Sequence, residues 1–212
     1  MMQFGKQGWH LGRSALLALT VLGFVPAANG QAPAAGLPLE EQVEVCADCH
    51  GENGNSTTPE IPSLAGQPAL TITNQMIYFR ETLRNNDVMT PQAQGLSDAE
   101  IEALAAYYAK QPVSPAPDLS DLDSRRYEQG KTLAREMRCA SCHRSDFSGN
   151  EQMPRLAGQR EDYLIKAMKD YRERNRGGPD TTMIDILRDV SNEEIEALAH
   201  FLAHYESQST SQ

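Results

Sequence analysis

The sequence lacks the features that would place it across a membrane or on nucleic acid. No stretch of its 212 residues reaches the roughly 20 apolar residues that a membrane-spanning helix needs, and the longest, residues 14–25, has 12. Positive charge is scarce, with 19 Lys and Arg against 29 Asp and Glu, so the formal net charge is −10. Because such a chain repels phosphate backbones, nucleic acid is not an expected partner.

Acidic residues are absent from positions 1–30, which have the pattern of a secretory signal peptide. Lys6 and Arg13 precede the apolar run, and a small-residue stretch at 27–30 follows it. We expect cleavage near Gly30, export to the periplasm and a soluble mature chain whose net charge, without the two cations, is −12 rather than −10. An uncleaved anchor associated with the membrane is the alternative, because the cleavage site departs from a small-x-small pattern.

Cysteine is also scarce, and its four occurrences form two copies of Cys-x-x-Cys-His. This pattern is typical of covalent haem attachment, in which each thiol adds to a haem vinyl group and the adjacent histidine binds the iron. Thioredoxin-like and zinc sites also use paired cysteines, but neither requires a histidine after the second cysteine twice over. The sequence therefore predicts two haem c groups and no disulfide, with these residues as ligands: Cys46, Cys49 and His50, and Cys139, Cys142 and His143.

The two motifs belong to an internal duplication. Three further pairs of segments match at offsets of 92, 92 and 94 residues: 61–67 with 153–159, 76–81 with 168–173, and 96–105 with 190–199. We therefore expect two homologous domains. The predicted boundaries are a first domain at 31–110, a proline-rich linker at 111–121, a second domain at 122–206 and a flexible tail at 207–212.

Each copy has the periodicity of an all-α domain. Ser97 with Glu100, and Ser191 with Glu194, form capping-box patterns ahead of apolar residues at helical spacing. The same periodicity predicts helices over about 67–83 and 159–174, and helices that lead into the cysteine pairs from about Leu39 and Arg125. Because domains of this size bury little surface, a haem would complete each core.

The methionines supply the candidates for the remaining axial position of each iron. Met89 and Met183 lie 39 and 40 residues after the motif histidine, in polar loops rich in Gly, Asn and Pro, where a thioether has little reason to be core. We expect them to bind the irons. Met76 and Met168 lie on amphipathic helices, and we expect them to pack in the core.

Two further histidines stand four residues apart near the C-terminus. The spacing of His200 and His204 could hold a metal ion, but their counterparts in the first copy are Ala106 and Lys110. We therefore expect a solvated helix face.

In order, the motifs are Cys-x-x-Cys-His, Pro-x-Leu-Ala-Gly-Gln, a methionine and a capped helix, present twice over residues 36–205. This arrangement resembles the cytochrome c4 family, the two-haem class I c-type cytochromes. The resemblance implies two tandem class I cytochrome c domains, each wrapped around one haem. It also implies that the carbonyls of Pro62 and Pro154 accept hydrogen bonds from His50 and His143 and orient them. The alternative for each proline is a simple turn.

An iron held by histidine and methionine has no open position, so it passes single electrons. We expect a periplasmic electron carrier, not an enzyme, between a quinol-oxidising complex and a terminal oxidase or another reductase. The alternatives are the dihaem subunit of a larger oxidoreductase such as a flavocytochrome, or a dihaem peroxidase, which would need a displaceable ligand. Residues 31–117 carry a net charge of −8 and residues 118–212 one of −4, so we expect basic partners at the first domain.

Overall fold

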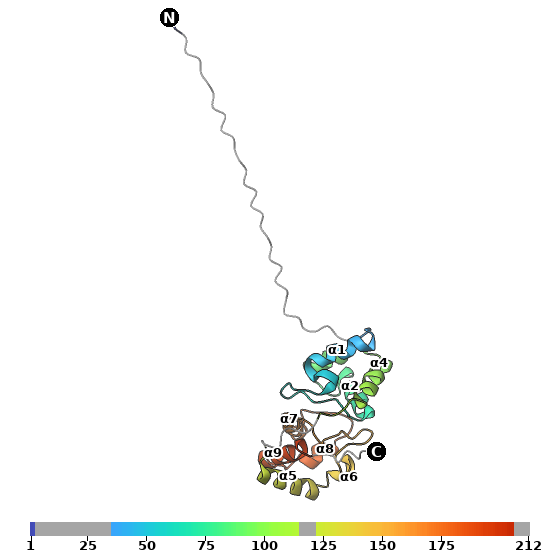
Figure 1. The fold of residues 1–212 in the computed structure, drawn as a ribbon, viewed down its shortest axis with the longest axis vertical. Helices are drawn as coiled ribbons and strands as arrows, with labels where there is room; N and C mark the ends of the chain where they lie inside the picture. The colour runs from blue at the N-terminus through green and yellow to red at the C-terminus, as the bar shows by residue number, and fades with distance from the viewer. Residues whose placement is uncertain (3–34, 115–121, 206–212) are drawn as a thin grey trace. The chain divides into compact units, whose positions relative to one another are not determined.

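The computed structural model describes residues 1–2, 35–114 and 122–205 (Figure 1). Residues 3–30 of the predicted signal peptide, most of the predicted linker and the predicted tail lie outside these residues. By its contacts the chain divides into two units, Met1–Gly30 and Gln31–Gln212, and the helices described below all lie in the second.

In the described residues, the first copy of the duplication is built from four α-helices and one short 3-10 helix. Their bounds are α1 Leu39–His50, η1 Glu52–Gly54, α2 Ala69–Arg80, α3 Met89–Ala93 and α4 Asp98–Ala109. Helix α4 packs against α1 and α2. The predicted helices are confirmed here, and α2 is shorter than expected: it begins after Pro68, whose ψ of 134° is not helical, and ends before Thr82, whose φ is 55°.

The second domain repeats this order with five α-helices. They are α5 Ser124–Glu136, α6 Ala140–His143, α7 Glu161–Arg172, α8 Thr182–Leu187 and α9 Asn192–Ala203. Helix α9 packs against both α5 and α7. Apart from an isolated bridge between Asn150 and Met153, the described residues form helices, turns and loops, so the all-α prediction is confirmed.

Both predicted capping boxes are confirmed. The Ser97 backbone N–H donates to Glu100 Oε2 at 2.8 Å, and the Glu100 N–H donates back to Ser97 Oγ at 3.3 Å. Ser191 and Glu194 make the same pair of bonds at 2.8 and 3.2 Å. Each box satisfies two backbone donors and fixes where the C-terminal helix of its domain begins.

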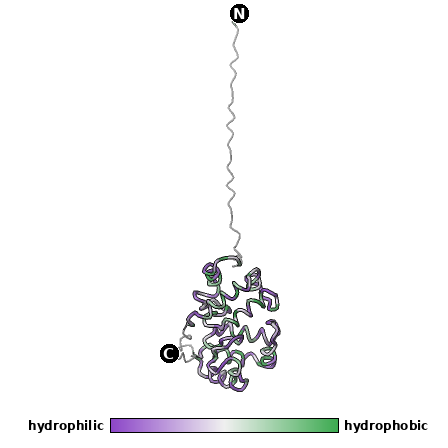
Figure 2. Tube along the Cα trace, turned by 90° about the vertical axis from the view of Figure 1, so that its right-hand side faces the viewer, coloured by the Kyte–Doolittle hydropathy of each residue, from purple (hydrophilic) through white to green (hydrophobic). Residues whose placement is uncertain are grey.

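Each domain has its own apolar core. In the first domain the buried cluster includes Ile101 and Leu104 from α4, with Met76 packed beside it. In the second it includes Leu198 from α9, with Met168 buried within it, so the prediction that Met76 and Met168 are core residues is confirmed. Figure 2 shows polar and apolar residues interleaved along the chain. No helix in the described part of the chain is long and apolar enough to cross a membrane.

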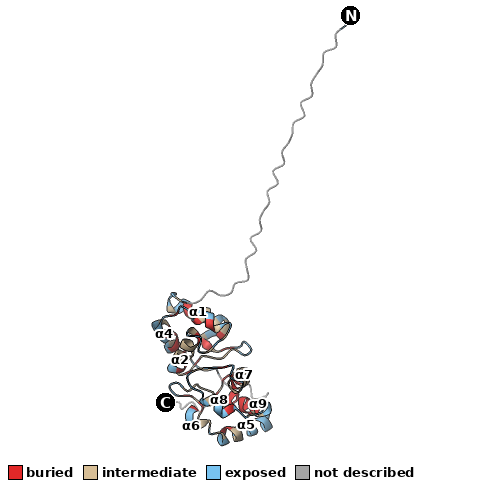
Figure 3. Cartoon of the chain, turned by 180° about the vertical axis from the view of Figure 1, so that it is seen from behind, coloured by how far each residue is buried: buried red, intermediate tan, exposed pale blue. Residues whose placement is uncertain are grey.

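Helix α9 is buried on most of its sides, as the buried residues along it show (Figure 3). Gly130 on α5 allows this close packing, since a Cβ added there would lie 2.0 Å from the carbonyl oxygen of Ala197. The two helix backbones are therefore nearly in contact where they cross.

Candidate haem sites

The first Cys-x-x-Cys-His motif occupies the last turns of α1. His50 is buried, and its Nδ1 lies 2.9 Å from the carbonyl oxygen of Pro62. Because a carbonyl can only accept, Nδ1 carries the proton and the lone pair of Nε2 is left for a metal. Burial lowers the pKa of His50, which favours the neutral imidazole that ligation requires. Burial also raises the pKa of the Cys46 thiol.

The second motif has the same geometry on a different backbone. Helix α5 ends before Cys139, and the separate helix α6 carries Cys142 and His143. His143 is buried and its Nδ1 lies 2.9 Å from the carbonyl oxygen of Pro154. Burial again lowers the pKa of the histidine. The structure thus contains both hydrogen bonds that the resemblance implied, while the roles of these residues toward iron stay predictions.

The loops that carry the two prolines are held in the same way in both domains. After Pro62, the N–H groups of Leu64 and Ala65 both donate to the carbonyl oxygen of Gly54, and the Gly66 N–H donates to that of Tyr108. The corresponding bonds in the second domain join the following donors and acceptors: Leu156 and Ala157 to Phe147, and Gly158 to Leu202. Each proline carbonyl is therefore fixed against the C-terminal helix of its own domain.

Met89 and Met183 are partly buried, but they lie in short helices rather than in the irregular loops that we expected. Met89 begins α3, where Asn86 Oδ1 accepts its backbone N–H at 2.8 Å. Met183 lies within α8 and packs against the core of the second domain. The sequence pattern missed these helices because each is only about one turn long. Ligation of iron by the two methionines stays a prediction.

The prediction of a solvated face for His200 and His204 is wrong, since both are buried. His200 Nε2 accepts the backbone N–H of Asp123 at 3.1 Å, so its Nδ1 carries the proton and donates to Glu161 at 2.9 Å. His204 Nδ1 donates to the carbonyl oxygen of His200 at 2.9 Å. A metal at His200 Nδ1 would require the proton to move to Nε2, against the Asp123 N–H. The cluster therefore joins the starts of α5 and α7 to α9.

Two arginines, the half-buried Arg84 and the buried Arg176, bear on whether the structure suits haem. Arg84 stacks on Phe79 and Arg176 stacks on Tyr171, at equivalent positions of the duplication. Both guanidinium groups reach the neutral Oε1 of Gln75, at 2.6 and 3.2 Å. Arg176 Nε has no hydrogen-bond partner among the described residues. Burial and the neighbouring Arg176 lower the pKa of Arg84. A half-buried and a buried guanidinium group, one of them with an unpaired buried donor, fit a group that brings anions, as haem does with its propionates.

Comparisons with known proteins agree with this geometry. Residues 32–107 match the family model for subunit III of cbb3-type cytochrome c oxidase, and residues 127–206 match that for cytochrome c. Cytochrome c4 of Thiocapsa roseopersicina is 34% identical over 181 residues, which span 81% of this chain and 94% of the relative. The chain belongs to the cytochrome c4 family.

Solved structures show the same relationship. The crystal structure of reduced recombinant cytochrome c4 from Pseudomonas stutzeri matches with a TM-score of 0.72 and 30% identity, over 79% of this chain and 97% of that one. Thiosulfate dehydrogenase (TsdBA) from Marichromatium purpuratum matches with a TM-score of 0.69 and 26% identity, over 82% of this chain and 42% of that one. As a member of the cytochrome c4 family, the chain is an electron carrier with two haem c groups.

Proposed function

We propose that this dihaem carrier passes single electrons in the periplasm from a quinol-oxidising complex to a terminal oxidase or another reductase. The observation that carries the proposal is the pair of buried motif histidines, each with Nδ1 bonded to a proline carbonyl at 2.9 Å. A histidine held in this way is prepared as a permanent ligand rather than as an acid or base. Export by the segment 1–30 is part of the same proposal.

Each domain supplies one full set of ligands. The cysteines would bind the haems through thioethers, and His50 with Met89, and His143 with Met183, would bind the irons. When bound, each haem supplies a reversible one-electron couple. The proline carbonyls keep the histidines in one tautomer, and both histidines are buried. With a histidine and a methionine both bound to each iron, the sites would transfer electrons and would not bind substrate.

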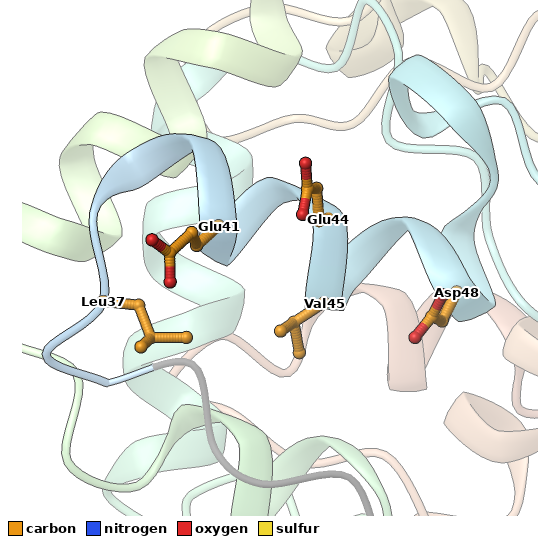
Figure 4. Close-up of a pocket in the computed structure, with 5 residues that line it drawn as sticks. All are labelled: Leu37, Glu41, Glu44, Val45 and Asp48. Atoms are coloured by element: carbon orange, nitrogen blue, oxygen red, sulfur yellow. The ribbon is translucent and has the colours of Figure 1, made fainter.

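The surface near the first motif suits a basic partner. Helix α1, which carries Cys46 and Cys49, also presents Glu41, Glu44 and Asp48 beside the apolar Leu37 and Val45 (Figure 4). An acidic rim with apolar residues steers a basic redox protein toward the end of α1.

The second motif has the opposite surroundings. Arg135, Arg138 and Arg144 flank its cysteines and are exposed. We infer that donor and acceptor dock at different domains, a basic protein at the first and an acidic one at the second. The rates of both reactions should then fall as salt is added.

The second candidate is a dihaem subunit of a larger oxidoreductase. The match to thiosulfate dehydrogenase favours it, because this chain covers only 42% of that protein and so corresponds to one part of it. Gel filtration of the protein from its native host separates the candidates. A free carrier elutes at the size of a single chain, and a subunit elutes with its enzyme.

An optical redox titration of the purified protein tests the proposal. Two low-spin haems with histidine–methionine ligation, each taking up one electron, are the expected result. A haem that binds carbon monoxide in the unmodified protein would contradict permanent ligation and favour the peroxidase alternative.

A further inference from the structure

The side-chain amides of Gln67 and Gln159 cross between the two cytochrome c domains. Both residues are buried. Gln159 accepts the Ser63 N–H at Oε1 (2.8 Å) and donates from Nε2 to the Ser63 carbonyl at 2.9 Å. Gln67 makes the same two bonds to Arg155, both at 3.0 Å. A flipped amide would place its NH2 group against a backbone N–H and its oxygen against a backbone carbonyl. Because both contacts would be unfavourable, the orientation of each amide is fixed.

Ser63 directly follows the proline that orients the first histidine. The carbonyl of Pro62 and the N–H of Ser63 are therefore the two ends of one planar peptide group. That group accepts from His50 Nδ1 at its oxygen (2.9 Å) and donates to Gln159 Oε1 at its nitrogen (2.8 Å). A continuous chain of hydrogen bonds thus runs from the histidine of the first domain to a glutamine of the second.

The reciprocal chain starts from the second histidine. His143 Nδ1 donates to Pro154 at 2.9 Å, and the N–H of the same peptide group, at Arg155, donates to Gln67 Oε1 at 3.0 Å. The duplication has therefore placed the glutamine of each Pro-x-Leu-Ala-Gly-Gln motif on the proline peptide of the other motif.

Hydrogen bonds in such a chain polarise one another. An acceptor at the peptide N–H raises the electron density on the carbonyl oxygen, which strengthens the bond that this oxygen accepts. A stronger bond to Nδ1 makes the imidazole a better electron donor to its metal. A better donor stabilises the oxidised iron and lowers the reduction potential.

We propose that Gln159 and Gln67 are positioning residues through which each domain tunes the haem of the other. Gln159 acts on the haem of the first domain through Pro62 and His50, and Gln67 acts on the haem of the second through Pro154 and His143. The inference rests on the proposed ligation by the two histidines.

The decisive variants are Gln159→Leu and Gln67→Leu in the full-length dihaem protein, since leucine nearly keeps the volume and removes both bonds. We expect Gln159→Leu to move the Nδ1–H proton resonance of His50 upfield in the reduced protein and to raise the potential of the first haem. The His143 resonance and the second haem should not move. Gln67→Leu should move the His143 resonance upfield and raise the potential of the second haem, and it should leave the His50 resonance and the first haem unchanged.

Thr71→Val is the matched control for a purely structural role. Thr71 is also buried and also crosses the domain interface, donating from Oγ1 to the carbonyl oxygen of Glu151 at 2.9 Å, but Glu151 lies on neither proline peptide. This variant should leave both histidine resonances and both potentials in place.

Gln159→Glu adds a test of sign, because a carboxyl oxygen still accepts the Ser63 N–H. The potential of the first haem should then not rise. If Gln159→Leu fails to fold, Gln159→Met is the substitute, with the same expected shifts.

Three results would overturn the inference: no change in either leucine variant, a shift at the haem of the substituted domain itself, or equal shifts in Gln159→Leu and Thr71→Val. Failure of the proposed ligation is distinguishable from these, because the unmodified protein would then lack iron-bound histidine signals from His50 or His143.

Discussion

The crossing of α5 and α9 gives the sharpest test of how the second domain is held together. In Gly130→Ala, the new Cβ would lie 2.0 Å from the Ala197 oxygen and 2.7 Å from the Phe201 Cβ. The closest obstacle is backbone, which cannot rotate away, so the helices must separate by about 1 Å or more to restore van der Waals contact.

The expected cost follows from two opposing terms. Overpacking of a tight core costs about 1–3 kcal/mol, and more when backbone must move. The higher helix propensity of alanine than of glycine stabilises the helix by about 1 kcal/mol. Since the clash is with backbone, we expect the free energy of unfolding of the second domain to fall by about 2 kcal/mol. For a domain of this size, that lowers the melting temperature by about 8–16 °C.

Thermal unfolding should be followed by circular dichroism and haem absorbance, because the single tryptophan of the chain is Trp9, in the predicted signal peptide. Gln129→Ala is the control: it lies on the same helix but is exposed, and alanine there should not destabilise. A Gly130→Ala protein as stable as this control would refute the close approach of α5 and α9.

Three further predictions concern the haems and the first domain. Met89→Ala and Met183→Ala should each open one iron to carbon monoxide and leave the other closed; unchanged spectra in either variant would remove that methionine from the ligand set. The first haem should have the lower potential, because its half carries a net charge of −8 against −4 for the second. In Met89→His, which lowers the potential of its own haem, the lower wave of a redox titration should therefore move, and movement of the upper wave would contradict the charge argument. Hydrogen bonds from Ser97, through its side chain and its backbone N–H, and from the Gly36 N–H lower the pKa of Glu100 from 4.5 to about 2. A lowered carboxyl pKa adds stability above pH 4.5 that is lost as the pH falls toward 2. In Glu100→Gln, the free energy of unfolding of the first domain should therefore fall less between pH 4.5 and 2 than in the unmodified protein.

Local signals in the sequence predicted much of the fold and of the site. The capping boxes and the Cys-x-x-Cys-His motifs depend on residues within a few positions of one another, so their geometry follows from the chain alone. The proline–histidine bonds span 12 and 11 residues, and only the resemblance to a family implied them.

Tertiary packing decided what the sequence left open or misplaced. His200 and His204 lie at positions that repeat like a solvated face, but α5 and α7 both pack against α9, and both histidines are buried. The sequence showed Gln67 and Gln159 as members of a repeated motif but did not predict their hydrogen-bond partners. Their partners lie 88 and 96 residues away in the other domain, a distance that no local pattern spans.

The duplication has kept the supports of the two motif histidines alike and let the surface around the cysteines diverge. The proline–histidine bond and the backbone bonds that fix each proline loop occur in both domains with nearly equal lengths. The residues around the two cysteine motifs differ instead, with acids on α1 and exposed arginines beside α6. Because the interior sets how an iron is held and the surface sets which protein can approach it, we expect two copies of one electron-transfer site to acquire different partners when charged surface residues are exchanged.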